Sequence, residues 1–105
     1  MKKYLSLLSL FTLLSCGNSI PDNSDVKEAA RAVIIHNLND PTSAEFHHNE
    51  VIKDIGDSTF IYTETINAKN SFGGSVKQNA TVKIKWAGGK PSEIENWRIL
   101  DIKTE

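Results

Sequence analysis

The sequence contains one cysteine, Cys16, whose position gives its thiol a specific chemistry. Two basic residues, Lys2 and Lys3, precede an apolar run over residues 5–14, and Cys16 follows this run almost at once. This arrangement is typical of an export signal, and the run is shorter than the roughly 20 apolar residues of a membrane-spanning helix. The thiolate is the nucleophilic form of cysteine. We therefore expect Cys16 to be modified, and we expect no disulfide within the chain.

Residues 13–16 (Leu-Leu-Ser-Cys) resemble the lipobox of bacterial lipoprotein precursors. The resemblance implies cleavage before Cys16, attachment of a diacylglyceryl group and palmitate, and a lipid-anchored protein of the cell envelope. Residues 1–15 would be the signal peptide, and residues 16–24 would be a short lipidated tether. Gly17, in place of the aspartate that favours the inner membrane, favours the outer membrane if the host is Gram-negative. The alternative is an ordinary secretory peptide with a chance cysteine.

The histidines could bind a metal ion, but their spacing does not favour it. His47 and His48 are adjacent, and adjacent residues of a regular strand point to opposite faces. Glu45 would share a face with His47, but no third ligand is in sight. His36 is expected at the end of a helix, where a protonated imidazole interacts favourably with the helix dipole. We therefore expect no metal site and no cofactor.

Patterns typical of catalysis are missing from the sequence as well. No glycine-rich loop follows a strand and opens a helix, as a phosphate-binding site requires. No Ser-His-Asp framework is recognisable, and lipid would consume the only thiol. Asp54, Asp57 and Glu64 lie around a predicted turn, where carboxylates are normally just solvated. We therefore expect the protein not to be an enzyme.

Charge and length limit the class of protein further. The 12 Lys and Arg residues include Lys2 and Lys3, so 10 would remain after cleavage, against 13 Asp and Glu. A chain with this balance lacks the basic footprint of a nucleic-acid-binding protein. Residues 25–105 suffice for one small domain, whose stability must come from its core.

The hydrophobic pattern predicts an α+β fold of one helix and four strands. Ser24 or Asp25 would cap the helix, and residues 37–41 would end it, since Pro41 disfavours helical geometry at Asp40. Its apolar stripe consists of Val26, Ala29, Ala30, Val33, Ile34 and Leu38. The predicted strands are residues 44–53, 59–67, 75–87 and 93–103, with a β-bulge near Ile99 and Leu100, where the alternation slips. One helix packed on a four-stranded antiparallel sheet would bury the stripe, in an element order similar to that of cystatin-like folds.

The connection between the second and third strands is the candidate binding site. Its residues of interest are Asn67, Lys69, Asn70, Phe72, Gly73 and Gly74. In a plain hairpin connection, the Asn and Gly residues would supply left-handed conformations and Phe72 would fold back over the core. In a recognition loop, Phe72 would be an anchor flanked by Lys69 and Asn70. The packing interpretation is favoured, because a lone Phe in a small domain usually belongs to the core, but both remain open.

Two stretches resemble a motif pair found in small exported or phage-linked bacterial proteins of uncharacterised function. They are residues 40–46 (Asp-Pro-Thr-Ser-Ala-Glu-Phe) and residues 67–74 (Asn-Ala-Lys-Asn-Ser-Phe-Gly-Gly). The chain departs from that pattern at residues 65–66, where a Cys-Gly pair is frequent, and at Ser75, where Tyr is frequent. The resemblance implies no activity.

These observations together predict a non-catalytic, lipid-anchored envelope protein that presents a small domain to a protein partner. The partner would be another envelope protein, a toxin or a phage component. The contacts would be the Phe72 loop and the open edge of the first strand, which could accept another strand. The main alternative is a passive spacer or assembly subunit. A hydrolase, or an inhibitor or immunity-type protein, with its site between helix and sheet, is less favoured.

Overall fold

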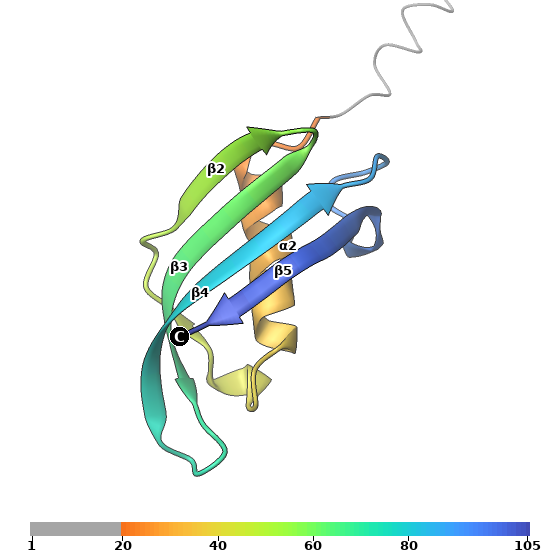
Figure 1. The fold of residues 1–105 in the computed structure, drawn as a ribbon. Helices are drawn as coiled ribbons and strands as arrows, with labels where there is room; N and C mark the ends of the chain where they lie inside the picture. The colour runs from red at the N-terminus through yellow and green to blue at the C-terminus, as the bar shows by residue number, and fades with distance from the viewer. Residues whose placement is uncertain (1–19) are drawn as a thin grey trace, which may run out of the picture.

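The computed structural model describes residues 20–105 and places them in one helix and one antiparallel sheet (Figure 1). In chain order the elements are α2 (Asn23–His36), η1 (Pro41–Ser43), β1 (Glu45–Phe46), β2 (Val51–Gly56), β3 (Thr59–Lys69), β4 (Ser75–Trp86), η2 (Ile94–Asn96) and β5 (Trp97–Thr104). The predicted α+β class, with a helix on a sheet, is confirmed. The export signal expected over residues 1–15, and Cys16, lie outside the described residues. Within residues 20–105, no helix is long and apolar enough to cross a membrane.

Helix α2 begins at Asn23 because Asp22 caps it. The Asp22 side chain accepts a hydrogen bond from the Asp25 backbone N–H (2.9 Å), and the Asp25 carboxylate accepts one from the Asp22 N–H (3.0 Å). This reciprocal pair is a capping box, which satisfies two backbone donors at the helix start. The predicted cap at Ser24 or Asp25 is therefore wrong, and the segment before the helix is shorter than predicted. His36 ends the helix, as expected.

The sheet is a meander with β3 at its centre. β4 pairs with one side of β3, and β5 pairs with β4. β1 and β2 pair one after the other with the other side of β3. The single strand predicted over residues 44–53 is therefore wrong, and the open edge predicted there is short and broken. Between the two strands His48 takes a left-handed conformation, with φ 60°. The Asn49 side chain replaces the missing strand by bonding the N–H and Oγ1 of Thr65 (3.0 and 2.8 Å).

The opposite edge strand, β5, contains the predicted bulge. Ile99 pairs with Ile84 and Asp101 pairs with Lys83, so Leu100 is the extra residue. A bulge twists an edge strand and hinders its pairing with another strand. This edge of the sheet is therefore protected against strand addition.

Helix α2 covers one face of the sheet, the inner face, and leaves the other, the open face, uncovered (Figure 1). The buried core joins the helix stripe to alternate residues of β3 and β4, as predicted. Trp97 of β5 extends the core, with its ring centroid 6.0 Å from that of Phe60 and its Nε1 donating to the Pro91 carbonyl (2.8 Å). Among residues 20–105, the buried core runs from Val26 of α2 to Trp97 of β5 and forms one cluster.

Candidate functional site

The β3–β4 hairpin carries the candidate binding loop at one end of the sheet. The two strands stay paired as far as Lys69 and Ser75, so the connection itself is residues 70–74. Figure 1 shows this loop at the opposite end of the sheet from Ile20, where the described chain begins. We call residues 70–74 the hairpin loop.

Asn70 organises the hairpin loop. Its side-chain Oδ1 accepts hydrogen bonds from the backbone N–H groups of Phe72 and Gly74, both at 3.0 Å. Its backbone N–H donates to the Gly74 carbonyl (2.9 Å), and its carbonyl accepts from the Gly73 N–H (3.0 Å). Gly73 has φ 83°, a conformation that residues with a side chain rarely adopt. Four hydrogen bonds within five residues therefore hold the loop in one shape.

The loop presents Phe72 to solvent. This side chain is 94% exposed, so the interpretation in which Phe72 folds back over the core is wrong. Lys69 lies beside the loop at the end of β3, where its N–H donates to Ser43 Oγ of η1 (2.9 Å). Asn67 lies farther back in β3, and its side chain bonds the His47 ring. Of the predicted site residues, Asn70, Phe72, Gly73 and Gly74 thus share one loop, and Asn67 belongs to the sheet.

A second group of functional side chains, not expected from the sequence, surrounds the buried carboxylate of Glu64 on the inner face. Glu64 is 1% exposed, so the expectation of a solvated carboxylate near a turn is wrong. Its Oε1 accepts from Tyr62 Oη (2.5 Å) and Arg31 Nε (3.0 Å). Its Oε2 accepts from Arg31 Nη2 (2.7 Å) and from the His48 backbone N–H (2.9 Å). These four bonds satisfy both carboxylate oxygens.

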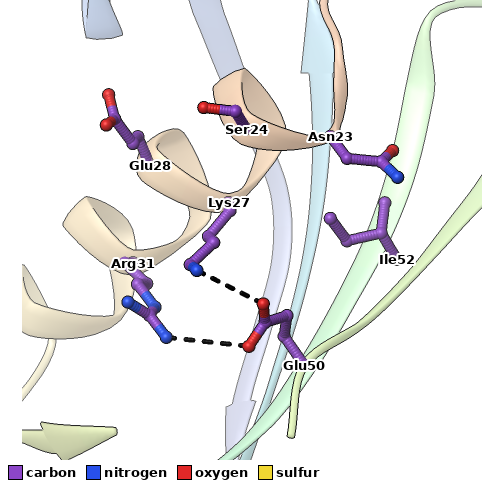
Figure 2. A pocket seen from close by; sticks show the side chains of 7 residues that line it. All are labelled: Asn23, Ser24, Lys27, Glu28, Arg31, Glu50 and Ile52. Atoms are coloured by element: carbon purple, nitrogen blue, oxygen red, sulfur yellow. Dashed lines mark ion pairs between the residues drawn. The ribbon is translucent and has the colours of Figure 1, made fainter. Parts of the chain in front are cut away.

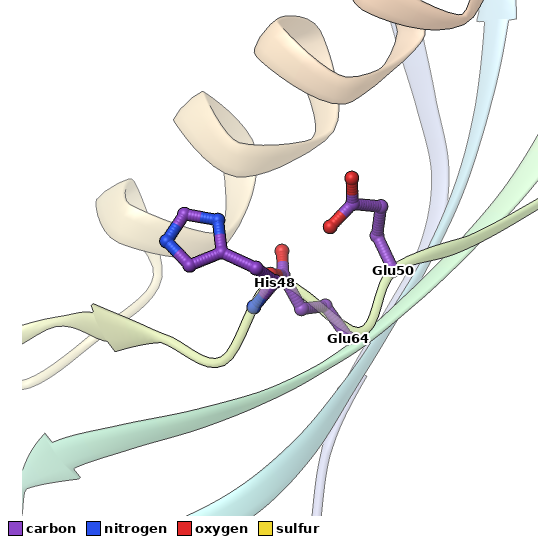
Figure 3. A group of neighbouring side chains, drawn as sticks. All are labelled: His48, Glu50 and Glu64. Atoms are coloured by element: carbon purple, nitrogen blue, oxygen red, sulfur yellow. Dashed lines mark hydrogen bonds between the residues drawn. The ribbon is translucent and has the colours of Figure 1, made fainter.

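The same cluster contains a metal-like geometry. Ligand atoms of His48, Glu50 and Glu64 lie within 4.8 Å of one another (Figure 3). Arg31 Nη2 faces all three, at 3.3 Å from His48 Nδ1, 3.8 Å from Glu50 Oε1 and 2.7 Å from Glu64 Oε2. The guanidinium therefore supplies the positive charge that this group of ligand atoms would otherwise seek. The sequence does not predict that His48 lies beside two glutamates, because its pattern predicts His48 in a regular strand.

The ionisation of the cluster follows from these contacts. Burial alone would raise the pKa of Glu64, but hydrogen bonds from Arg31, Tyr62 and the His48 backbone hold this pKa below its ordinary value. Burial, together with the hydrogen bond to Glu64, raises the pKa of Tyr62. The pKa of Arg31 is raised, mainly by its hydrogen bond to Glu64. The cluster is therefore an ionised carboxylate and guanidinium with a neutral phenol.

A polar hollow of about 660 Å³ lies next to this cluster, between the first half of α2 and β2. Figure 2 shows Lys27 and Arg31 reaching from the helix toward Glu50. Lys27 Nζ is 3.3 Å from Glu50 Oε2, so the charges at the floor of the hollow are already paired. A carboxylate with a lowered pKa does not hold a proton near neutral pH, so Glu64 is not suited to be a general acid. The cluster fits a role in holding α2 on the sheet.

Comparisons with family models, curated proteins and solved structures found no match to this chain. The function is therefore argued from the geometry of the chain itself.

Proposed function

We propose that this protein is a lipid-anchored protein of the bacterial cell envelope whose small domain binds a protein partner through the hairpin loop. The export signal and the lipobox-like residues before Cys16 support the anchor. In a Gram-negative host, Gly17 favours the outer membrane. The observation that carries the binding role is the exposure of Phe72 on a loop held by Asn70.

An exposed aromatic ring on an ordered loop is suited to be an interface anchor. Moving a Phe side chain out of water is worth about 2–3 kcal/mol, and this chain leaves Phe72 almost wholly in water. Aromatic anchors dominate the affinity of many protein interfaces. Because the loop is already ordered, little conformational entropy is lost when a partner binds. Phe72 can therefore contribute most of its transfer free energy to binding.

The position of the loop leaves room for a partner. The 11 residues of β3 extend for roughly 36 Å, and the loop lies at the end of the sheet away from Ile20. A lipid attached through Cys16 would hold the other end. A partner can then contact the loop without meeting the anchored segment.

The decisive experiment is chemical crosslinking in native membranes followed by purification of the protein. We expect one partner to be captured by the native protein, and Phe72→Ser to weaken this capture about thirtyfold, since losing a central anchor costs about 2 kcal/mol. Asn70→Ala should weaken it as well, because the loop loses the side chain that holds it. Circular dichroism should show the same fold for all variants.

Leu100→Ser is the matched control, because Leu100 is also exposed but lies in the bulge of β5. It should retain the partner. If Phe72→Ser and the native protein capture the same partner equally, the loop is not the binding site. If neither captures any partner, the passive spacer becomes the better interpretation.

A further inference from the structure

The open face of the sheet is cationic, although the described residues are acidic overall. Cross-strand partners share a face of a sheet, so the partners of the half-buried alternate residues of β3, which face away from α2, also lie on the open face. The cations on this face are Lys53, Lys69, Lys77, Lys83, Lys85, Arg98 and Lys103. Its carboxylates are Glu45 and Asp101. The remaining acidic residues lie on the helix side, in turns, in the loop after β4 or at the C-terminus.

The arrangement of these cations is unfavourable for the isolated sheet. Lys85 lies directly opposite Arg98 in the β4–β5 ladder, and like charges in this position destabilise a sheet. Of the seven cations, Lys83 is the one with a carboxylate directly opposite, that of Asp101. Within residues 20–105, the one ion pair on this face joins Lys85 to Asp57 in the β2–β3 turn, at 2.9 Å. Departures from local stability are expected where a surface has a function. The unpaired cations therefore indicate an anionic occupant.

The composition of the open face indicates what kind of anion it binds. The Phe, Tyr and Trp side chains of the described residues lie on the inner face, except for Phe72 at the loop, so the open face offers none of these rings for stacking nucleic-acid bases. Six of its seven cations are lysines, which protein interfaces tend to exclude from their centres. Lysine is a mobile point charge that suits phosphate groups. The hollows of about 660 and 340 Å³ are lined by α2, on the other side of the sheet.

We propose that the open face binds the phosphate groups of an anionic phospholipid surface. Lys and Arg near such a surface contribute about 1 kcal/mol each, so several act together. The residues between Cys16 and the helix cap at Asp22 span roughly 20 Å at most, which keeps the face within reach of the bilayer. This last argument rests on the proposed acylation of Cys16. The arguments from the charge of the open face and from its lack of Phe, Tyr and Trp side chains do not depend on acylation.

A face bound to the bilayer would also orient the hairpin. Lys69 and Lys77 continue the cationic face to the base of the hairpin loop. The hairpin would then lie along the membrane, and Phe72 would meet a partner located at the membrane surface. The two activities are separate: the face binds lipid, and the loop binds protein.

Vesicle cosedimentation tests the inference without the lipid anchor, using residues 17–105. We expect binding to vesicles that contain phosphatidylglycerol, a loss of binding at high salt, and none to pure phosphatidylcholine. Lys103→Gln should weaken binding about fivefold, and Lys53→Gln, Lys83→Gln and Lys103→Gln together about a hundredfold. Lys90→Gln is the matched control, because Lys90 is exposed in the loop after β4, and it should bind as the native domain does.

Equal binding by the native domain and the triple variant would overturn the proposal, provided that circular dichroism shows both folded. Binding to polyphosphate but not to vesicles would also overturn it, in favour of a free polyanion. Binding to an acidic protein but not to vesicles would likewise overturn the proposal.

Phe72→Ser should leave vesicle binding unchanged. If Phe72→Ser abolishes vesicle binding and the triple variant does not, Phe72 is a membrane anchor. Both proposals, that the open face binds lipid and that the loop binds protein, would then be wrong. If the domain binds vesicles but the protein captures no partner, the proposed partner binding is contradicted and the lipid-binding inference stands.

Discussion

Glu64 is a charged side chain in the core, and its contribution can be measured directly. Because Arg31, Tyr62 and the His48 backbone all bond its ionised form, Glu64→Gln removes the nearer counter-charge of Arg31 and leaves only Glu50, at 3.8 Å. Breaking a buried ion pair costs about 3–5 kcal/mol, and the partial exposure of Arg31 reduces this. We expect Glu64→Gln to lower the free energy of unfolding by about 2–3 kcal/mol in urea titration.

The difference in free energy of unfolding between the native protein and Glu64→Gln depends on pH, and this dependence tests whether Glu64 is ionised in the folded state. The folded-state pKa of Glu64 is lowered, so its stabilisation is complete above the ordinary glutamate pKa of about 4.3 and disappears as the pH falls through the lower folded value. The gap between the native protein and Glu64→Gln should therefore be constant near neutral pH and narrow in acid. Glu28→Gln, an exposed change on α2, should stay within about 0.5 kcal/mol of native. A gap that widens in acid would contradict this assignment.

For single residues, the sequence predicts which face of a strand a side chain lies on better than it predicts which other side chains contact it. Glu64 occupies an inward position of β3 between Tyr62 and Ile66, and a carboxylate there requires a buried partner. The strand alternation places Glu64 on the buried face. It does not identify Arg31, 33 residues away in the sequence, as the partner of Glu64. The sequence singles out Phe72 but favours packing over exposure, because its exposure depends on the bonds of Asn70 within the loop, which no pattern of residue types specifies.

The start of α2 offers a test at the level of elements. Asp22→Ala removes the side chain that accepts from the Asp25 N–H, so we expect a loss of about 1 kcal/mol in the free energy of unfolding. Ser24→Ala should change it by less than about 0.5 kcal/mol, because Ser24 is already inside the helix. Thermal unfolding followed by circular dichroism would measure both. Equal losses for the two variants would argue against the cap at Asp22.

The elements themselves followed the sequence closely where periodicity was strong. The helix stripe, the alternation of β3 and β4 and the bulge near Leu100 were all predicted, because each is a regular pattern or a visible break in one. The first strand was not predicted correctly. Its interruption depends on the left-handed His48 and on Asn49 bonding Thr65, and these are contacts between segments rather than local preferences.

At the scale of the whole molecule, the proposed lipid attachment at Cys16 can be tested separately from the proposed roles of the open face and the hairpin loop. If Cys16 is the acylation site, cells given labelled palmitate should incorporate the label into the native protein and not into Cys16→Ser. Phe72→Ser should be labelled as the native protein is, because the hairpin loop lies at the opposite end of the sheet from the point where the described chain begins. Labelling of Cys16→Ser would exclude the proposed lipoprotein processing.

The meander also has a consequence for how the chain folds. The antiparallel strands pair mainly with their neighbours in the sequence, so each strand pairing closes only a short loop. The helix comes first in the chain, yet its apolar stripe has no cover until β3 and β4 have formed. Trp97, which completes the core beside Phe60, belongs to the last strand. If the chain is exported N-terminus first, as the proposed function requires, its helix stays uncovered until nearly all of the chain has crossed the membrane.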